Sequence, residues 1–205
     1  MKKIMLLISL VVFLFSENLN IKEIYLRSYN YEKMGDYEDA IKVLIPLYKK
    51  YPNGYTINLR LAYLFYLNKK YKNAINHYQM ASKILPYSFE PKLGMMRVYL
   101  TTKDYKRCIE IGNVILKTDF YNYYGNYYYA LSLIKIKDYK NALVLVNKIL
   151  SLYPTDTLFL VELGKIYYFQ GKKELSKKIF EDVLILDPNN VIAREYLKSS
   201  YWYNF

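Results

Sequence analysis

Small residues and prolines return along this chain at a fixed interval of 34 residues. The small residues on this interval are Ala40, Ala74, Cys108, Ala142 and Ser176. The prolines Pro52, Pro86, Pro154 and Pro188 follow the same interval, with one copy missing between the second and the third. A period of 34 is the length of one helix-turn-helix unit, which cannot bury its apolar face alone and stacks on its neighbours. The sequence therefore predicts an all-α solenoid of about five units.

Each unit contains two stretches of helical period separated by a short polar turn. The turns fall at residues 34–36, 68–70, 102–104, 137–138 and 170–172. In four units an aromatic residue follows the turn, three residues before the small residue: Tyr37, Tyr71, Tyr105 and Tyr139. The aromatic and the small residue share one helix face, which predicts a close approach of two helices there. We expect the second helix of each unit to end at the proline.

Two units carry a residue pattern that resembles the tetratricopeptide repeat family. The fifth unit has Leu163, Gly164, Tyr167, Ser176, Phe180, Val183 and Pro188 at that family's spacing. The second unit has Leu61, Ala62, Phe65, Tyr71, Ala74, Tyr78, Ala81 and Pro86. The resemblance covers about residues 21 to 188 and implies a right-handed α-solenoid. The repeats that it implies are 21–54, 55–88, 89–122, 123–156 and 157–190, followed by a capping helix and tail over 191–205.

The chain departs from the family pattern at several positions. The family's usual Trp early in the first helix is replaced by Ile24, Asn58, Lys92, Asn126 and Leu160. The third unit is degenerate, with Gly112 where a large side chain is usual and Phe120 in place of proline. Pro46 falls inside the second helix of the first unit, where we expect it to kink that helix.

The resemblance also implies a binding groove, because in this family the first helices line the concave face. The residues that the register places there are Tyr25, Tyr29, Lys33, Leu59, Tyr63, Tyr66, Leu93, Arg97, Leu100, Tyr124, Tyr127, Leu131, Ile134, Val161, Lys165 and Tyr168. Such an aromatic and aliphatic surface suits an extended peptide or a helix, and it would also stack on sugar rings. Tyrosine accounts for 27 of the 205 residues, so composition alone would place several tyrosines in the groove.

Some family members clamp the acidic C-terminus of chaperones with Lys, Asn and Arg. Tyr25 and Tyr29 stand here where the Lys and Asn are expected. We therefore do not expect this chain to act as such a clamp.

Residues 1–16 have the outline of a secretory signal peptide. Lys2 and Lys3 precede an apolar run over residues 4–15 that is interrupted only by Ser9. This run is shorter than the ~20 residues that a membrane span needs. We expect cleavage after Ser16 and export to the periplasm or cell envelope, although Leu14 fits the cleavage site poorly. The alternative is an uncleaved anchor, with residues 4–15 in the inner membrane.

The sequence predicts no catalytic residue, metal ligand or cofactor. Its single histidine, His77, cannot form the His pairs of catalytic zinc sites, and its single cysteine, Cys108, cannot form an internal disulfide. There is no glycine-rich phosphate loop or nucleophile motif. The net charge of +12 comes from lysines spread over helix ends and turns, which indicates a basic surface rather than a nucleic-acid stripe. We expect a protein partner, no small-molecule substrate, no nucleic acid and no enzymatic activity.

Together these patterns suggest an exported scaffold that holds a partner peptide or helix in a Tyr-rich groove and helps to assemble an envelope complex. Two other functions fit the same sequence. One is a glycan- or peptidoglycan-binding module that uses the tyrosines as a stacking platform. The other is a membrane-anchored adaptor that faces the cytoplasm.

Overall fold

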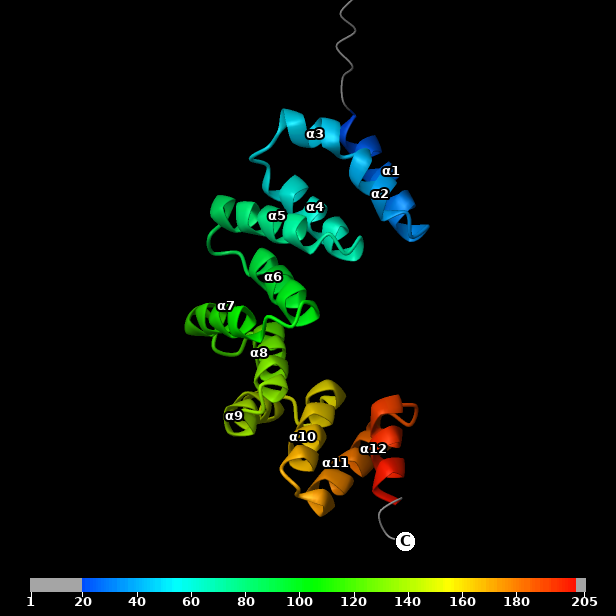
Figure 1. Cartoon of the computed structure of the whole chain (residues 1–205), viewed down its shortest axis with the longest axis vertical. Coiled ribbons are helices and arrows are strands. Elements are labelled where there is room, and N and C mark those ends of the chain that lie inside the picture. The colour runs from blue at the N-terminus through cyan, green and yellow to red at the C-terminus, as the bar shows by residue number, and fades with distance from the viewer. Residues whose placement is uncertain (1–19, 202–205) are drawn as a thin grey trace, which may run out of the picture.

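The computed structural model describes residues 20–201, and every regular element in that range is a helix. The helices are α1 (Ile21–Lys33), α2 (Tyr37–Lys42), α3 (Ile45–Lys50), α4 (Tyr55–Leu67), α5 (Tyr71–Ile84), α6 (Glu90–Thr101), α7 (Tyr105–Thr118), α8 (Tyr123–Lys135), α9 (Tyr139–Leu150), α10 (Thr157–Phe169), α11 (Lys173–Leu186) and α12 (Val191–Tyr201). Each packs mainly on its neighbours in sequence, and the stack curves into an arc (Figure 1). The predicted all-α solenoid is confirmed. The expected signal peptide and residues 202–205 lie outside the described residues.

The second helix of the first unit is divided at Pro46. α2 ends at Lys42, and α3 begins at Ile45 with Pro46 in its first turn. Proline has no backbone N–H and clashes with the preceding turn, but at a helix start neither defect matters. The expected kink is therefore a complete break into two short helices.

Every turn between the paired helices contains one residue with left-handed backbone geometry. These residues are Gly35 (φ 78°), Lys69 (57°), Lys103 (61°), Lys137 (65°) and Gly171 (75°), again 34 apart. The residue after the left-handed one donates its N–H back into the helix, as Lys70 does to the Phe65 carbonyl at 2.9 Å. This pattern is the Schellman ending of a helix. Lysine occupies a glycine position in three of the five turns.

The small residues on the 34-residue interval are buried where the two helices of a unit meet. Ser176 Oγ donates to the Gly164 carbonyl at 2.9 Å, and Ser28 Oγ donates to the Ala40 carbonyl at 3.0 Å. Burial raises the pKa of the Cys108 thiol to about 11, so the thiol stays protonated. Cys108 therefore packs as a small core residue, as expected.

Polar side chains at three of the family's Trp positions hold the loop that precedes them. Asn58 Nδ2 donates to the carbonyls of Pro52 and Gly54 at 2.7 and 2.8 Å. Asn126 repeats this with Phe120 and Asn122 at 3.1 and 2.9 Å, and Lys92 Nζ with Pro86 and Ser88. The acceptors lie six and four residues earlier each time. Hydrogen bonding to a loop thus replaces the packing of a tryptophan.

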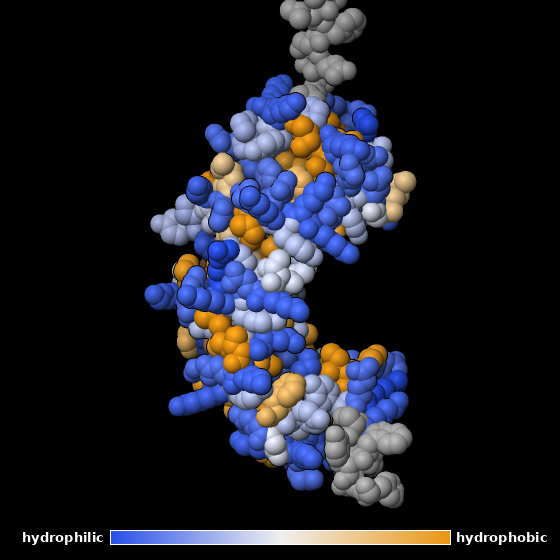
Figure 2. Space-filling model, in the orientation of Figure 1, coloured by the Kyte–Doolittle hydropathy of each residue, from blue (hydrophilic) through white to orange (hydrophobic). Residues whose placement is uncertain are grey.

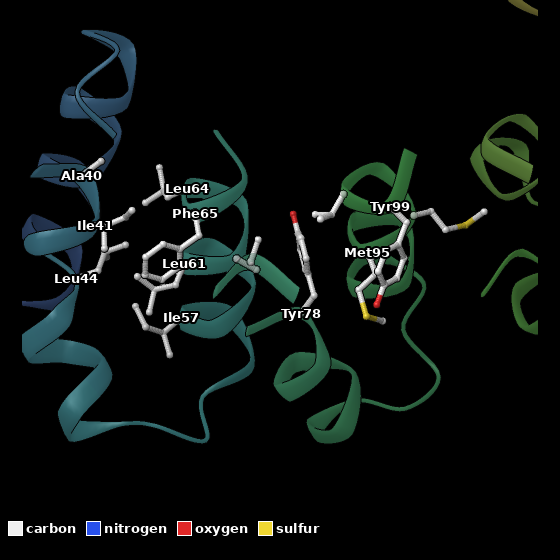
Figure 3. Packing of buried hydrophobic residues seen from close by; sticks show 14 of the residues in the cluster. Ala40, Ile41, Leu44, Ile57, Leu61, Leu64, Phe65, Tyr78, Met95 and Tyr99 are labelled. Atoms are coloured by element: carbon white, nitrogen blue, oxygen red, sulfur yellow. The ribbon is translucent and has the colours of Figure 1, made fainter. Parts of the chain in front are cut away.

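The first of the three buried hydrophobic clusters extends across the N-terminal half of the arc. Figure 3 shows the Tyr78 ring standing between Leu61 and Phe65 on one side and Met95 and Tyr99 on the other. α6 approaches this ring at Gly94, where an added Cβ would lie 2.3 Å from Tyr78 Cε1. Only glycine permits that approach. Gly112 likewise faces the ring of Tyr129, which fills the space of the missing large side chain.

Candidate functional site

A pocket of about 590 Å³ opens among α1, α4, α5, α6 and α8. Its lining residues, which we call the tyrosine pocket, are Tyr25, Tyr29, Glu32, Thr56, Leu59, Arg60, Tyr63, Tyr78, Glu90, Leu93, Arg97, Tyr124 and Tyr128. Apart from Tyr78, all of them come from the first helices of units one to four. Figure 2 shows that the arc is hollowed on one side.

Seven of the expected groove residues line this pocket. They are Tyr25, Tyr29, Leu59, Tyr63, Leu93, Arg97 and Tyr124. Lys33, Tyr66, Leu100, Tyr127, Leu131, Lys165 and Tyr168 do not line it. Ile134 and Val161 are core residues, 7% and 4% exposed, so they cannot contact a partner without repacking.

Three of the expected residues that lie outside the pocket are occupied with other contacts. The ring of Tyr127 packs against Phe159, with centroids 5.6 Å apart. Tyr168 meets Tyr196 of α12 edge to face at 4.9 Å, and Lys165 forms an ion pair with the buried Glu162 at 2.8 Å. Tyr127 thus joins α8 to α10 and Tyr168 joins α10 to α12, whereas the Lys165 ion pair lies within α10.

Six pocket residues were missed by the sequence reasoning: Glu32, Thr56, Arg60, Tyr78, Glu90 and Tyr128. Arg60 and Tyr128 each lie one residue after an expected position, Leu59 and Tyr127, and a wider helical face would have included them. Tyr78 belongs to α5, a second helix. No sequence signal pointed to it, because the family resemblance counts only first helices in the groove.

Arg60 is a buried and locally neutralised cation at one side of the pocket. It pairs with the carboxylate of Glu32 and donates to Ser28 Oγ at 3.2 Å. Its guanidinium also lies 3.8 Å from the ring centroid of Tyr29, within the range of a cation–π contact. Its Nε makes no hydrogen bond to any residue between 20 and 201.

Arg97 is the other cation of the pocket, and it lacks a carboxylate partner. Its guanidinium lies 5.6 Å from the ring centroid of Tyr63 and 5.8 Å from that of Tyr66. No ion pair joins it to a carboxylate within residues 20–201. On the same helix, Glu90 accepts a hydrogen bond from the Tyr55 hydroxyl at 2.8 Å.

Tyr78 brings a buried hydroxyl to this pocket. The residue is 1% exposed, and its hydroxyl has no hydrogen-bond partner within the described chain. Burial raises the pKa of Tyr78 to about 12, and the nearby positive charge of Arg97 offsets part of this effect. The phenol is therefore protonated at neutral pH and can donate a hydrogen bond.

His77 is held by packing. Its ring stacks on Phe65 with centroids 5.3 Å apart, and its Nδ1 lies 2.9 Å from Asn58 Oδ1. Burial lowers the pKa of His77, which favours the neutral imidazole. Within residues 20–201 there is no group of three His, Cys, Asp or Glu side chains that could hold a metal ion.

None of the helices between residues 20 and 201 combines the length and apolar character that a membrane span requires.

Stacked helix pairs with a pocket on their first helices define an α-helical repeat protein with a candidate binding surface. Residues 25–89 and 159–190 each match a tetratricopeptide repeat family. The chain belongs to the tetratricopeptide repeat family. No curated protein matches its sequence.

Several solved structures share the fold. A tetratricopeptide repeat protein from Parabacteroides merdae aligns at a TM-score of 0.78 with 18% identity, over 88% of this chain and 72% of that one. MamA residues 41 to the end from Desulfovibrio magneticus align at 0.72 with 16% identity, over 83% and 96%. YrrB, described as a TPR protein with an unusual peptide-binding site, aligns at 0.67 with 11% identity, over 85% and 90%. At these identities the likeness shows the fold alone.

Proposed function

We propose that this chain is a non-enzymatic scaffold that binds a segment of a partner protein in the tyrosine pocket. The observation that carries this proposal is the make-up of the pocket. Five tyrosines surround two buried donors, Tyr78 Oη and Arg60 Nε, that make no hydrogen bond within residues 20–201. Tyrosine offers a large contact area at low entropic cost and a hydroxyl for hydrogen bonds. Tetratricopeptide repeat proteins generally act as interaction modules, and the description of YrrB names a peptide-binding site.

The shape of the site favours an extended peptide or one helix as the occupant. The lining residues come from four successive first helices, so the pocket runs across the stack. A ligand that crosses the stack can place several side chains against successive units.

An affinity capture tests this proposal. The full chain is used as bait beside a variant carrying Tyr29→Ala, Tyr63→Ala and Leu93→Ala, all in the pocket. A matched control carries Tyr87→Ala, Tyr121→Ala and Leu152→Ala, which are exposed and outside it. We expect a protein that is retained by the native chain and the control and lost by the pocket variant. Equal capture by all three would overturn the pocket as the binding site.

Sedimentation of the same three proteins with peptidoglycan tests a glycan-binding function. If the pocket tyrosines stack on sugar rings, the native chain will sediment with insoluble peptidoglycan, and the pocket variant will remain in the supernatant. Protein capture without sedimentation supports the scaffold.

We also propose export to the periplasm or cell envelope, where the scaffold would take part in assembling a complex. The support is the sequence of residues 1–16, with two lysines ahead of an apolar run. A fusion of residues 1–30 to an alkaline phosphatase that is active only after export tests this proposal. We expect the fusion to be active and to lose its activity when Leu7 and Val11 are replaced with Asp. An inactive fusion would contradict export.

A further inference from the structure

Of the two arginines that line the tyrosine pocket, one is paired with a carboxylate and the other is not. Arg60 is paired with Glu32, whereas Arg97 has no carboxylate partner in the described chain. Glu90 lies seven residues earlier on α6, about 10 Å away along the helix axis. The pocket therefore has one uncompensated positive end, at Arg97.

A second donor stands beside Arg97. The Tyr78 hydroxyl is buried, lines the same pocket and donates to no acceptor within residues 20–201. Burial raises the pKa of this phenol, and the Arg97 guanidinium lies close enough to offset part of that larger effect. A buried donor without a partner is destabilising unless a ligand or water satisfies it. A guanidinium and a phenol at one place can together donate to the two oxygens of an anion.

We propose that Arg97 and Tyr78 bind a carboxylate of the partner peptide, either an acidic side chain or a C-terminus. This inference rests on the proposed function and specifies its ligand. Tyr63 lies beside Arg97, and Tyr124 lines the same pocket, so the peptide residues next to the carboxylate are apolar or aromatic.

The charges favour a carboxylate over a phosphate group. Glu32 is neutralised by Arg60, but Glu90 lines the same pocket and has no ion pair within residues 20–201. Glu90 would therefore repel a ligand group with two negative charges more strongly than one with a single charge. One free guanidinium matches one negative charge. The arrangement also differs from the two-carboxylate clamp of the family, because Tyr25 and Tyr29 replace its Lys and Asn.

Matched peptide mixtures test the carboxylate site. Two fluorescein-labelled octapeptide mixtures, blocked at both ends and randomised among uncharged residues, carry a fixed central Glu or Gln. A third carries central phosphoserine, and a fourth has central Gln with a free C-terminus. Anisotropy titration of the native full chain should show the Glu or the free C-terminal mixture binding about tenfold more tightly than the blocked Gln mixture, as expected for a charge-assisted hydrogen bond.

Variants then assign the preference to its residues. Arg97→Met should reduce the difference between the carboxylate and Gln mixtures to less than about twofold, and Tyr78→Phe should reduce it by severalfold. Arg107→Met is the matched control, because Arg107 is exposed on α7 and lies outside the pocket. It should keep the native preference. Circular dichroism checks that all variants remain helical.

The outcomes separate this inference from the proposed function. Peptide binding by the native chain without a preference for a carboxylate overturns the carboxylate site and leaves the scaffold function intact. A preference that survives both Arg97→Met and Tyr78→Phe also overturns it, as does tighter binding of phosphoserine than of Glu. Failure of the native chain to bind any mixture overturns both.

Discussion

Lys69, Lys103 and Lys137 adopt a left-handed backbone conformation that glycine adopts without strain. Gly35 and Gly171 occupy the equivalent places in the first and fifth units. The sequence located these turns from their polar residues, but it did not show that three lysines would take a glycine conformation. Their geometry is imposed by the packing of the two helices on either side, which no local pattern encodes.

Replacing Lys103 with Gly should stabilise the chain. A left-handed non-glycine residue costs about 1–2 kcal/mol, which exceeds the roughly 0.5–1 kcal/mol that glycine loses through its freer unfolded state. We expect a gain of up to about 1 kcal/mol in the free energy of unfolding, measured by urea titration. Lys178→Gly, within the helix α11, should instead destabilise by about 1 kcal/mol. Equal effects would contradict a strained turn.

His77 should make stability depend on pH in a defined direction. Burial lowers its pKa in the folded chain, whereas the unfolded chain retains an ordinary value near 6.5. Between these two pKa values the unfolded state binds more protons than the folded state. The contribution of His77 to the free energy of unfolding is therefore fully present above about pH 6.5 and is lost as the pH drops toward the folded pKa. His77 is the only histidine, so no other histidine contributes to the change in stability over this pH range.

Urea titrations at pH 7.5 and 5.5 test this prediction. The native chain should be less stable at pH 5.5, and His77→Gln should remove most of the difference. A native chain that is equally stable at both values would show that the imidazole is not desolvated on folding.

The site residues were only partly predictable from the sequence. Seven pocket positions could be predicted, because helical register and the family resemblance indicate which face of each first helix is concave. Tyr78 could not be found in this way, because it enters from a second helix through the gap that Gly94 leaves. Tyr127 and Tyr168 face the adjacent helices instead of the pocket. Composition makes tyrosine common on every helix face, so residue type alone did not separate these roles.

At the scale of the helices, the contact between α5 and α6 depends on one glycine. Gly94 allows the Tyr78 ring to lie directly against the backbone of α6, and this contact positions both Tyr78 and Arg97. The fold-level period predicted that these helices would be neighbours. The period could not predict the distance between the two helices, because that distance is set by the packing of the large Tyr78 ring against Gly94, which has no side chain.

Gly94→Ala should strongly destabilise the chain, because the new Cβ would overlap the Tyr78 ring. Overpacking of a buried contact costs typically 1–3 kcal/mol. Adding Tyr78→Leu should recover part of the loss, since the smaller side chain leaves room for the methyl group. Thermal unfolding of the two single variants and the double variant measures this coupling. Additive losses would contradict the proposed contact.

At the scale of the whole molecule, the core of residues 20–201 is a series of three clusters along the arc rather than one centre. The last cluster joins α10, α11 and α12, where the ring of Tyr196 stacks on Phe180 at 4.7 Å. Repeat arrays of this kind are stabilised mainly by contacts between neighbours. The 34-residue period was therefore sufficient to predict the architecture, because each unit packs on its neighbours in the same way.

Phe180→Ala should unfold the C-terminal end of the arc before the rest. Phe180 is almost completely buried, and such truncations cost about 3–5 kcal/mol. Hydrogen exchange should show lost protection in α10 to α12 and retained protection in α4 to α7. A uniform loss along the whole chain would show a single cooperative unit instead.

Site-specific photocrosslinking would show whether a partner peptide occupies the tyrosine pocket. The full chain is produced with benzoylphenylalanine in place of Tyr63, and separately in place of Tyr153, which is exposed and outside the pocket. Both are irradiated in an extract of the cells that produce the protein. We expect a discrete protein adduct at position 63 that is absent at position 153 and is reduced by Arg97→Met. An adduct only at position 153, or the same adducts at both positions, would contradict this expectation.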